Sequence, residues 1–225
     1  MTSIYQQALG SDFAQLHPQI QRRFGFSSQD RLAALGTGVM EEICHGSAYT
    51  LPFLYAGLPR RIMFPECGRQ VPFSIENYAY VDALGRETVT WLRTFRLRTT
   101  RHFDAYMIYS SQRGGIVDYL GTHQHRAVDL DLSVDARGGL CIRSGAQRFY
   151  EGPLAFAFPL QLAGIAEVCE WYDDAQQAFR IKVHVANRRW GPLFGYHGSF
   201  QVEWHPMPAG QCPPHGLPQR VEHRE

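Results

Sequence analysis

The chain has 225 residues, of which 44% are hydrophobic, and a formal net charge of +1. The near-neutral charge gives no electrostatic reason to expect a nucleic-acid partner, and the apolar content is too high for a disordered chain. Its five cysteines are scattered without a CxxC pair, which argues against a disulfide framework and a structural zinc site. With no signal-peptide pattern and no apolar run long enough to span a bilayer, we expect a soluble, cytoplasmic protein.

The N-terminal residues 3–24 are expected to form a helical cap. Ile4, Tyr5 and Leu9 have helical spacing, and Gly10 ends this first piece. Pro18 suits the first turn of a second piece, since a proline there loses no helical hydrogen bond. The cap is predicted to pack on a sheet as a lid or plug.

The clearest strand pattern lies in residues 180–204, which are predicted to form two strands joined by a turn at Trp190-Gly191-Pro192. Apolar and polar residues alternate on both sides of this turn, as in strands with one buried and one wet face. Gly195 and Gly198 interrupt the second strand and indicate a bend or a close approach.

Earlier segments have the same short apolar alternation, separated by turn residues such as Asp135-Ala136-Arg137-Gly138. A short helix is expected near residues 51–58, where Gly57 and Pro59 end it. The expected strands before the hairpin are 32–45, 71–81, 87–98, 101–110, 114–121, 127–134, 139–150 and 164–172.

About ten short strands without βαβ alternation are typical of an all-β barrel or sandwich. We therefore predict a single, mainly β domain over residues 1–225: an antiparallel up-and-down meander forming a lipocalin-like barrel or half-barrel with N-terminal helices. The sheet body is expected at about 31–205, and the tail 206–225, rich in proline, glycine and charge, is expected to be loosely ordered. Small barrels of this kind can hold one ligand.

Arg93 is the most informative polar residue, because it lies in the middle of an apolar stripe. Trp91 and Phe95 share its strand face, and so does Glu87. An inward arginine is costly unless paired. One interpretation is a buried ion pair with Glu87, Glu76 or Glu41; the other is an anchor for an anionic ligand in a cavity.

Other chemistry-bearing residues form weaker patterns. His102 and Asp104 share a strand face and are candidates for acid–base work, as is His197. His123 and His125 have a metal-ligand spacing but no third ligand in a motif, so no metal site is predicted. No GxSxG, HExxH, P-loop or GxGxxG motif occurs, and catalytic residues stay unassigned.

Several short motifs, in order along nearly the whole chain, resemble the DUF4166 family, a bacterial domain of unknown function. They are residues 4–13, Ala56-Gly57-Leu58-Pro59, the arrangement of Glu87, Trp91, Arg93 and Phe95, Gly138-Gly139-Leu140, and residues 192–198. The resemblance brings no established activity. Because the family is similar in places to a module joined to NAD(P)-binding reductase-like domains, it implies a reductase-like protein as a candidate partner.

The leading hypothesis is a protein that binds a small apolar or amphipathic acid in a barrel cavity without a cofactor. Arg93 would anchor the acid, and the other predicted site residues are Trp91, Phe95, Glu87, Tyr196 and Phe200. The alternatives are a metal-independent enzyme acting on such a ligand and an accessory interaction module for a partner oxidoreductase.

Overall fold

The computed structural model describes residues 2–159, 163–208 and 211–225. Within these ranges, eleven strands form one sheet. Their bounds are β1 (Leu32–His45), β2 (Gly68–Val81), β3 (Glu87–Arg96), β4 (Thr100–Ser110), β5 (Gly115–Leu120), β6 (Arg126–Val134), β7 (Leu140–Glu151), β8 (Leu154–Phe158), β9 (Ile165–Asp173), β10 (Ala178–Asn187) and β11 (Gly191–Pro206). The helical segments are α1 (Ile4–Leu9), η1 (Gly10–Gln15), α2 (Pro18–Gly25), η2 (Ser28–Asp30), η3 (Ala48–Thr50), α3 (Leu51–Gly57), η4 (Leu58–Arg60) and η6 (Pro214–Gly216).

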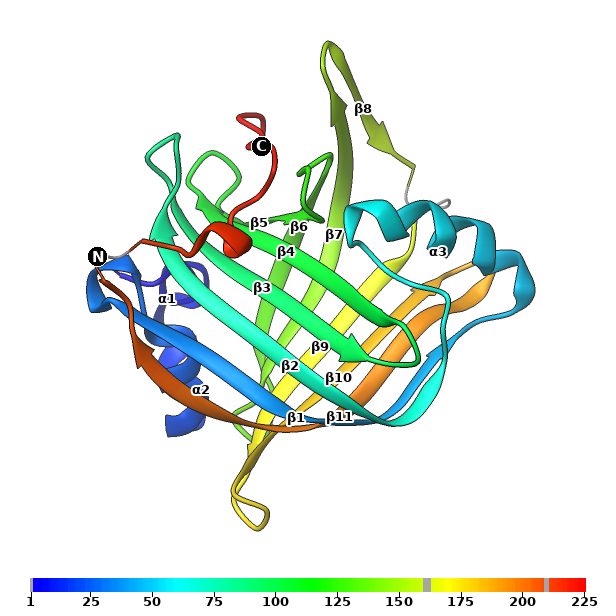
Figure 1. Cartoon of the computed structure of the whole chain (residues 1–225). Helices are drawn as coiled ribbons and strands as arrows, with labels where there is room; N and C mark the ends of the chain where they lie inside the picture. The colour runs from blue at the N-terminus through cyan, green and yellow to red at the C-terminus, as the bar shows by residue number, and fades with distance from the viewer. Residues whose placement is uncertain (1, 160–162, 209–210) are drawn as a thin grey trace.

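The sheet closes into an antiparallel barrel of 10 strands (Figure 1). Strands β1 to β7 follow one another around the wall, β7 pairs with β9, and β11 pairs with β1. Strand β8 pairs with the second half of β7 alone and projects beyond the barrel (Figure 1). The predicted mainly β barrel with N-terminal helices is confirmed, and the wall is closed rather than half open.

The alternation of side chains explains why these segments line a barrel. In β10, Phe179, Ile181, Val183 and Val185 are all buried, and the residues between them face outward. Strand β11 continues this pattern opposite β10, with Phe200 paired to Phe179. A one-residue slip would turn the whole apolar set outward, so burial fixes the register.

Glycines allow the wall to bend where β1 and β11 meet. A Cβ at Gly38 would lie 2.1 Å from the Ser199 carbonyl oxygen, and one at Gly198 would lie 2.2 Å from that of Val39. Neither position therefore accepts a side chain without moving the backbone. The β1–β11 register also shifts between Met40 and Glu42, which marks a bulge.

The N-terminal helices close one end of the barrel (Figure 1). Ser3 begins α1 with a capping box: its hydroxyl accepts from the Gln6 N–H at 3.1 Å, and the Gln6 side chain accepts from the Ser3 N–H. Pro18 starts α2, as its restricted backbone predicts. The plug presents Tyr5 and Phe24, which pack edge to face with centroids 4.8 Å apart.

A buried ion pair fastens this plug to the wall. The Arg23 Nε of α2 donates to the Glu170 carboxylate of β9, and both side chains are 1% exposed. The Arg23 guanidinium also lies 5.0 Å from the centroid of the Phe200 ring. Burial raises the pKa of Glu170, and the charge of Arg23 opposes that rise. The two residues are 147 positions apart, so sequence spacing does not reveal the pair.

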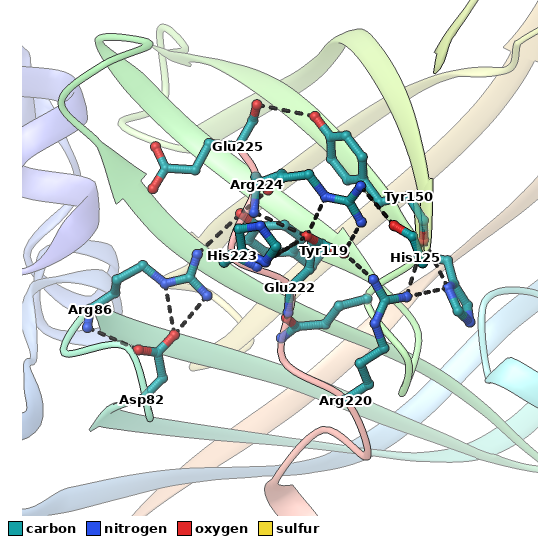
Figure 2. A network of polar contacts seen from close by, with 12 residues as sticks. Asp82, Arg86, Tyr119, His125, Tyr150, Arg220, Glu222, His223, Arg224 and Glu225 are labelled. Atoms are coloured by element: carbon teal, nitrogen blue, oxygen red, sulfur yellow. Dashed lines mark hydrogen bonds and ion pairs between the residues drawn. The ribbon is translucent and has the colours of Figure 1, made fainter. Parts of the chain in front are cut away.

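The C-terminal segment lies on the outside of the barrel (Figure 2). Met207 and Cys212 join a second apolar cluster formed by outward-facing residues of β2 to β5, Tyr106 among them. Farther along, Arg220 and Arg224 flank the Glu222 carboxylate and hold its pKa at about 2 despite desolvation. These contacts give the tail, whose composition predicts loose order, a defined path over the wall.

One prediction about the cysteines is wrong. Cys141 of β7 and Cys169 of β9 are direct neighbours in register and form a disulfide, with Cα atoms 4.3 Å apart. Their 28-residue separation and lack of a motif hide the pairing, which arises from the strand order. None of the helices in the described part of the chain has the length and apolar character to cross a membrane.

Candidate ligand-binding cavity

A cavity of about 160 Å³ lies inside the barrel. Its lining is mostly aliphatic, because inward residues of β6, β7, β10 and β11 meet there. Five polar side chains from β3, β5, β6 and β7 interrupt this lining. The aliphatic lining includes Met107, Val128, Leu130, Ile142, Val183 and Leu193, and the five polar residues are Arg93, Asp118, Arg126, Ser144 and Gln147.

Trp91 connects the cavity to the N-terminal plug. Its indole N–H donates to the Tyr5 hydroxyl at 2.8 Å, and that hydroxyl donates to the Met107 sulfur at 3.3 Å. Trp91 and Met107 both line the cavity. The plug therefore fixes two lining side chains through α1, although Tyr5 itself is not among the lining residues.

The opposite end is covered by η3 and α3. Tyr49, Phe53 and Leu54 from these helices line the cavity, together with Trp190 from the β10–β11 turn. Leu54 is buried, whereas Phe53 is 65% exposed. The cavity thus ends under a short helix that is only partly packed on the barrel.

Arg93 is buried in the barrel and held by neutral groups. Its Nε donates to the Phe103 carbonyl oxygen at 2.9 Å, and one terminal nitrogen donates to the Tyr196 hydroxyl at 3.2 Å. The guanidinium carbon lies 3.8 Å from the centroid of the Phe103 ring. Among the described residues, no carboxylate forms an ion pair with Arg93.

The three carboxylates considered as partners for Arg93 have other contacts. Glu87 accepts from the N–H and hydroxyl of Ser28, both at 2.6 Å. The remaining two are also engaged on the outside of the barrel. Glu76 accepts from the Tyr78 hydroxyl at 2.6 Å, and Glu41 lies 2.9 Å from Arg180.

Arg126 is a second cation that lines the same cavity, and it is partly buried. It donates to the Gln147 amide oxygen, while its Nε has no hydrogen-bond partner among the described residues. Its guanidinium carbon lies 5.1 Å from the centroid of the Phe158 ring of β8. Desolvation lowers the pKa of Arg126 to about 10, so it remains a cation at neutral pH. No ion pair between Arg126 and a carboxylate occurs in the described ranges.

Asp118 is the acid that faces this cavity. Burial raises its pKa to about 7, and the charge of Arg93 with a hydrogen bond from the Tyr106 backbone opposes the rise. One carboxyl oxygen is buried without a hydrogen-bond partner in the described residues. No ion pair joins Asp118 to either arginine there. The site therefore combines two cations with an acid that is half ionised near neutral pH.

Two of the predicted site residues, Trp91 and Arg93, line the cavity, and Tyr196 accepts the hydrogen bond from Arg93. Phe95 and Phe200 pack on either side of Phe73, with centroid distances of 5.1 and 5.9 Å. These two rings form the core beside the site. Glu87 lies at the N-terminal end of β3 and binds Ser28 of η2, as described above.

The candidate acid–base residues lie on the outer face of the wall. His102 contacts the Thr94 hydroxyl at 3.2 Å, and Asp104 lies 3.2 Å from Arg61. His197 lies 3.5 Å from Glu41 and is substantially exposed. Burial lowers the pKa of His102 and raises that of Asp104.

The two histidines with metal-ligand spacing also lie outside the cavity. The rings of His123 and His125 stack with centroids 5.4 Å apart. The Nδ1 of His125 lies 3.0 Å from the Tyr150 carbonyl oxygen and close to Arg220 of the tail (Figure 2). The described residues contain no group of three or more metal-ligating side chains.

Sequence reasoning missed Asp118 and Arg126 as cavity residues. Both follow the rule that identified Arg93: Asp118 shares a face with Ile116 and Leu120, and Arg126 with Val128. Strand β5, which holds Asp118, has only six residues, and Arg126 is the first residue of β6, so alternation gives a weak signal at both positions. Their meeting in one cavity depends on barrel closure, which spacing alone does not specify.

Comparisons with known proteins cover most of this architecture. Residues 16–200 match the family described as "Domain of unknown function (DUF4166)", a range that runs from α2 into β11. The "Uncharacterized protein YndH" of Bacillus subtilis (strain 168) is 34% identical over 204 residues, which cover 90% of this chain and 98% of that protein. No solved structure matches the chain.

Proposed function

The chain belongs to the DUF4166 family, and from its cavity we propose that it binds a small amphipathic acid inside the barrel. The observation that carries this proposal is a pair of arginines, the buried Arg93 and the partly buried Arg126, facing one apolar cavity without a carboxylate ion pair in the described residues. Buried cations are costly unless an anion or several hydrogen bonds compensate them. An acidic ligand would supply that missing charge.

The lining of the cavity suggests a ligand with two parts, an acidic group and an apolar group. A carboxylate would accept from Arg126, whose Nε lacks a partner, and from the side of Arg93 that faces the cavity. The rest of the ligand would pack on Val128, Leu130 and Val183. A cavity of about 160 Å³ suits an apolar group about the size of benzene, which an engineered apolar cavity of about 150 Å³ holds in another protein. Phenylacetate is therefore a suitable probe.

Binding of phenylacetate by isothermal titration calorimetry tests the proposal, with neutral phenylacetamide as the matched ligand. Arg126→Gln is expected to weaken phenylacetate binding by about tenfold or more, because a hydrogen bond to a charged group is worth about 1.5–3 kcal/mol. Arg143→Gln is the control, since Arg143 lies on the outer face of β7 and is 56% exposed.

Three outcomes would contradict the proposal. The first is equal affinity for phenylacetate and phenylacetamide, and the second is an unchanged affinity in Arg126→Gln. The third is the absence of heat for acids of this size, tested with phenylacetate and hexanoate.

A second candidate function is acid–base chemistry on the bound acid, and Asp118 is the observation that favours it. Its pKa of about 7 allows it to donate or accept a proton at neutral pH inside the cavity. His102, Asp104 and His197 point away from this cavity, which leaves Asp118 as the residue to test. Deuterium exchange at the α-carbon of phenylacetate, compared between the protein and Asp118→Asn, would reveal such chemistry. Equal exchange rates would remove it.

A further inference from the structure

The mouth of the cavity carries exposed apolar side chains from two separate elements. On η3 and α3, Tyr49, Phe53 and Tyr55 are 42%, 65% and 59% exposed. On β8, Leu154 and Phe156 are 53% and 44% exposed. Both elements lie at the end of the barrel from which the β7–β8 hairpin projects (Figure 1). Aromatic and aliphatic groups gathered at one end of a molecule mark an interaction surface.

Exposed arginines lie around this mouth, together with Glu151 of β7, which pairs in register with Leu154 and is 52% exposed. Two segments near it, residues 46–65 and 186–191, contain no aspartate or glutamate. They contain four arginines, all exposed: Arg60, Arg61, Arg188 and Arg189. Arg61 lies 3.2 Å from Asp104, while the other three form no ion pair within the described residues.

We propose that this mouth docks on an anionic phospholipid bilayer. Exposed aromatic groups partition into the interface of a bilayer, and neighbouring arginines bind the lipid phosphates. The apolar groups lie on a short helix and on a hairpin that projects from the barrel (Figure 1), and their exposure leaves them free to insert between lipid headgroups. The inference goes beyond the proposed ligand and holds whether or not an acid binds in the cavity.

Docking here would place the cavity next to the lipid. Phe53 and Trp190 line the cavity and belong to the same helix and turn that form the mouth. An amphipathic acid would then pass between the bilayer and Arg126 without crossing bulk water. This last step rests on the proposed function, whereas the docking itself does not.

Flotation with lipid vesicles tests the docking. The protein is expected to float with vesicles of equal parts phosphatidylglycerol and phosphatidylcholine, and to stay unbound with pure phosphatidylcholine. Added salt is expected to weaken binding, because it screens the arginines. Binding should fall roughly tenfold or more in Arg188→Gln/Arg189→Gln, since each basic residue near an anionic surface contributes about 1 kcal/mol.

Apolar variants separate docking from the cavity. Tyr55→Ser/Leu154→Ser is expected to reduce flotation with anionic vesicles and to leave phenylacetate binding unchanged, because neither residue lines the cavity. Leu84→Ser is the control: Leu84 is 49% exposed in the β2–β3 turn, at the opposite end of the barrel. Arg31→Gln/Arg137→Gln is the matched control for charge at that opposite end.

Several results would overturn the docking. Equal flotation with neutral and anionic vesicles removes the role of charge, and equal loss in Leu84→Ser removes the role of the mouth. No flotation with either vesicle also overturns it, as expected if the surface serves a protein partner instead. A loss of phenylacetate binding with intact flotation counts against the cavity proposal alone.

Discussion

At the scale of a single residue, Asp118 makes the stability of the protein depend on pH. In the folded chain burial raises its pKa to about 7, whereas an unfolded aspartate titrates near 4. Between these values the folded state binds more protons than the unfolded state, so stability falls as pH rises. The stabilising proton is fully bound below about pH 4 and is lost as pH passes through about 7.

Because of this proton, we expect the free energy of unfolding to depend on pH, and Asp118→Asn should remove that dependence. The free energy of unfolding of the parent protein should decline by about 1.4 kcal/mol per pH unit, relative to the variant, between pH 4 and 7. Urea denaturation at several pH values measures that difference. Asp131→Asn, at an exposed position of β6, is expected to show no such slope. A pH-independent difference between the parent and Asp118→Asn would contradict the burial of an ionisable Asp118.

Element-scale stability depends on how α2 is fixed to the barrel. The Arg23–Glu170 pair is fully buried, with two terminal nitrogens of Arg23 and one oxygen of Glu170 lacking hydrogen-bond partners in the described residues. Removing one partner of such a pair leaves an uncompensated charge, while removing both does not. The net attraction between Arg23 and Glu170 therefore contributes little to stability. The pair holds the plug in place because separating the two residues would leave buried charges without partners.

Glu170→Gln is expected to lower the free energy of unfolding by about 3–5 kcal/mol, and Arg23→Met/Glu170→Leu by clearly less. Chemical denaturation monitored by tryptophan fluorescence measures both. Glu42→Gln is the matched control, since its pair with Arg69 is largely exposed and worth about 0–1 kcal/mol. A loss in the double variant as large as in Glu170→Gln would show that α2 is held by something else.

The elements differ in how well the sequence predicts them. Strand β1 matches its predicted bounds of 32–45, because its alternation is long and ends at clear turn residues. Strand β8 was not predicted: residues 154–158 are continuously apolar and exposed, so neither alternation nor burial marks them as a strand. Their pairing with β7 beyond the barrel edge depends on the three-dimensional fold and not on a local sequence pattern.

At the scale of the whole molecule, the alternation of apolar and polar residues along the strands predicts a barrel. The site, in contrast, forms only because the barrel wall closes. Arg93 stands out in its strand as a charged residue within an apolar stripe, and it lines the cavity. Arg126 and Asp118 join it only because β5 and β6 come round the wall to face the same interior. The Cys141–Cys169 disulfide likewise depends on β7 pairing with β9 across the β8 hairpin.

The two ends of the barrel differ in how they are covered. One end is sealed by α1 and α2, whose Tyr5 holds Trp91 in place. The other is covered by α3, with exposed apolar groups and exposed arginines around it. The vesicle and ligand measurements test the α3 end and the cavity independently.

A crystal structure of the protein with phenylacetate tests the central claim most directly. We expect the carboxylate within hydrogen-bond distance of Arg126, about 3 Å, on the side of the cavity that Arg93 shares, and the ring against Val128 and Leu130. Phenylacetate bound outside the barrel, or inside it with the carboxylate away from both arginines, would contradict the account.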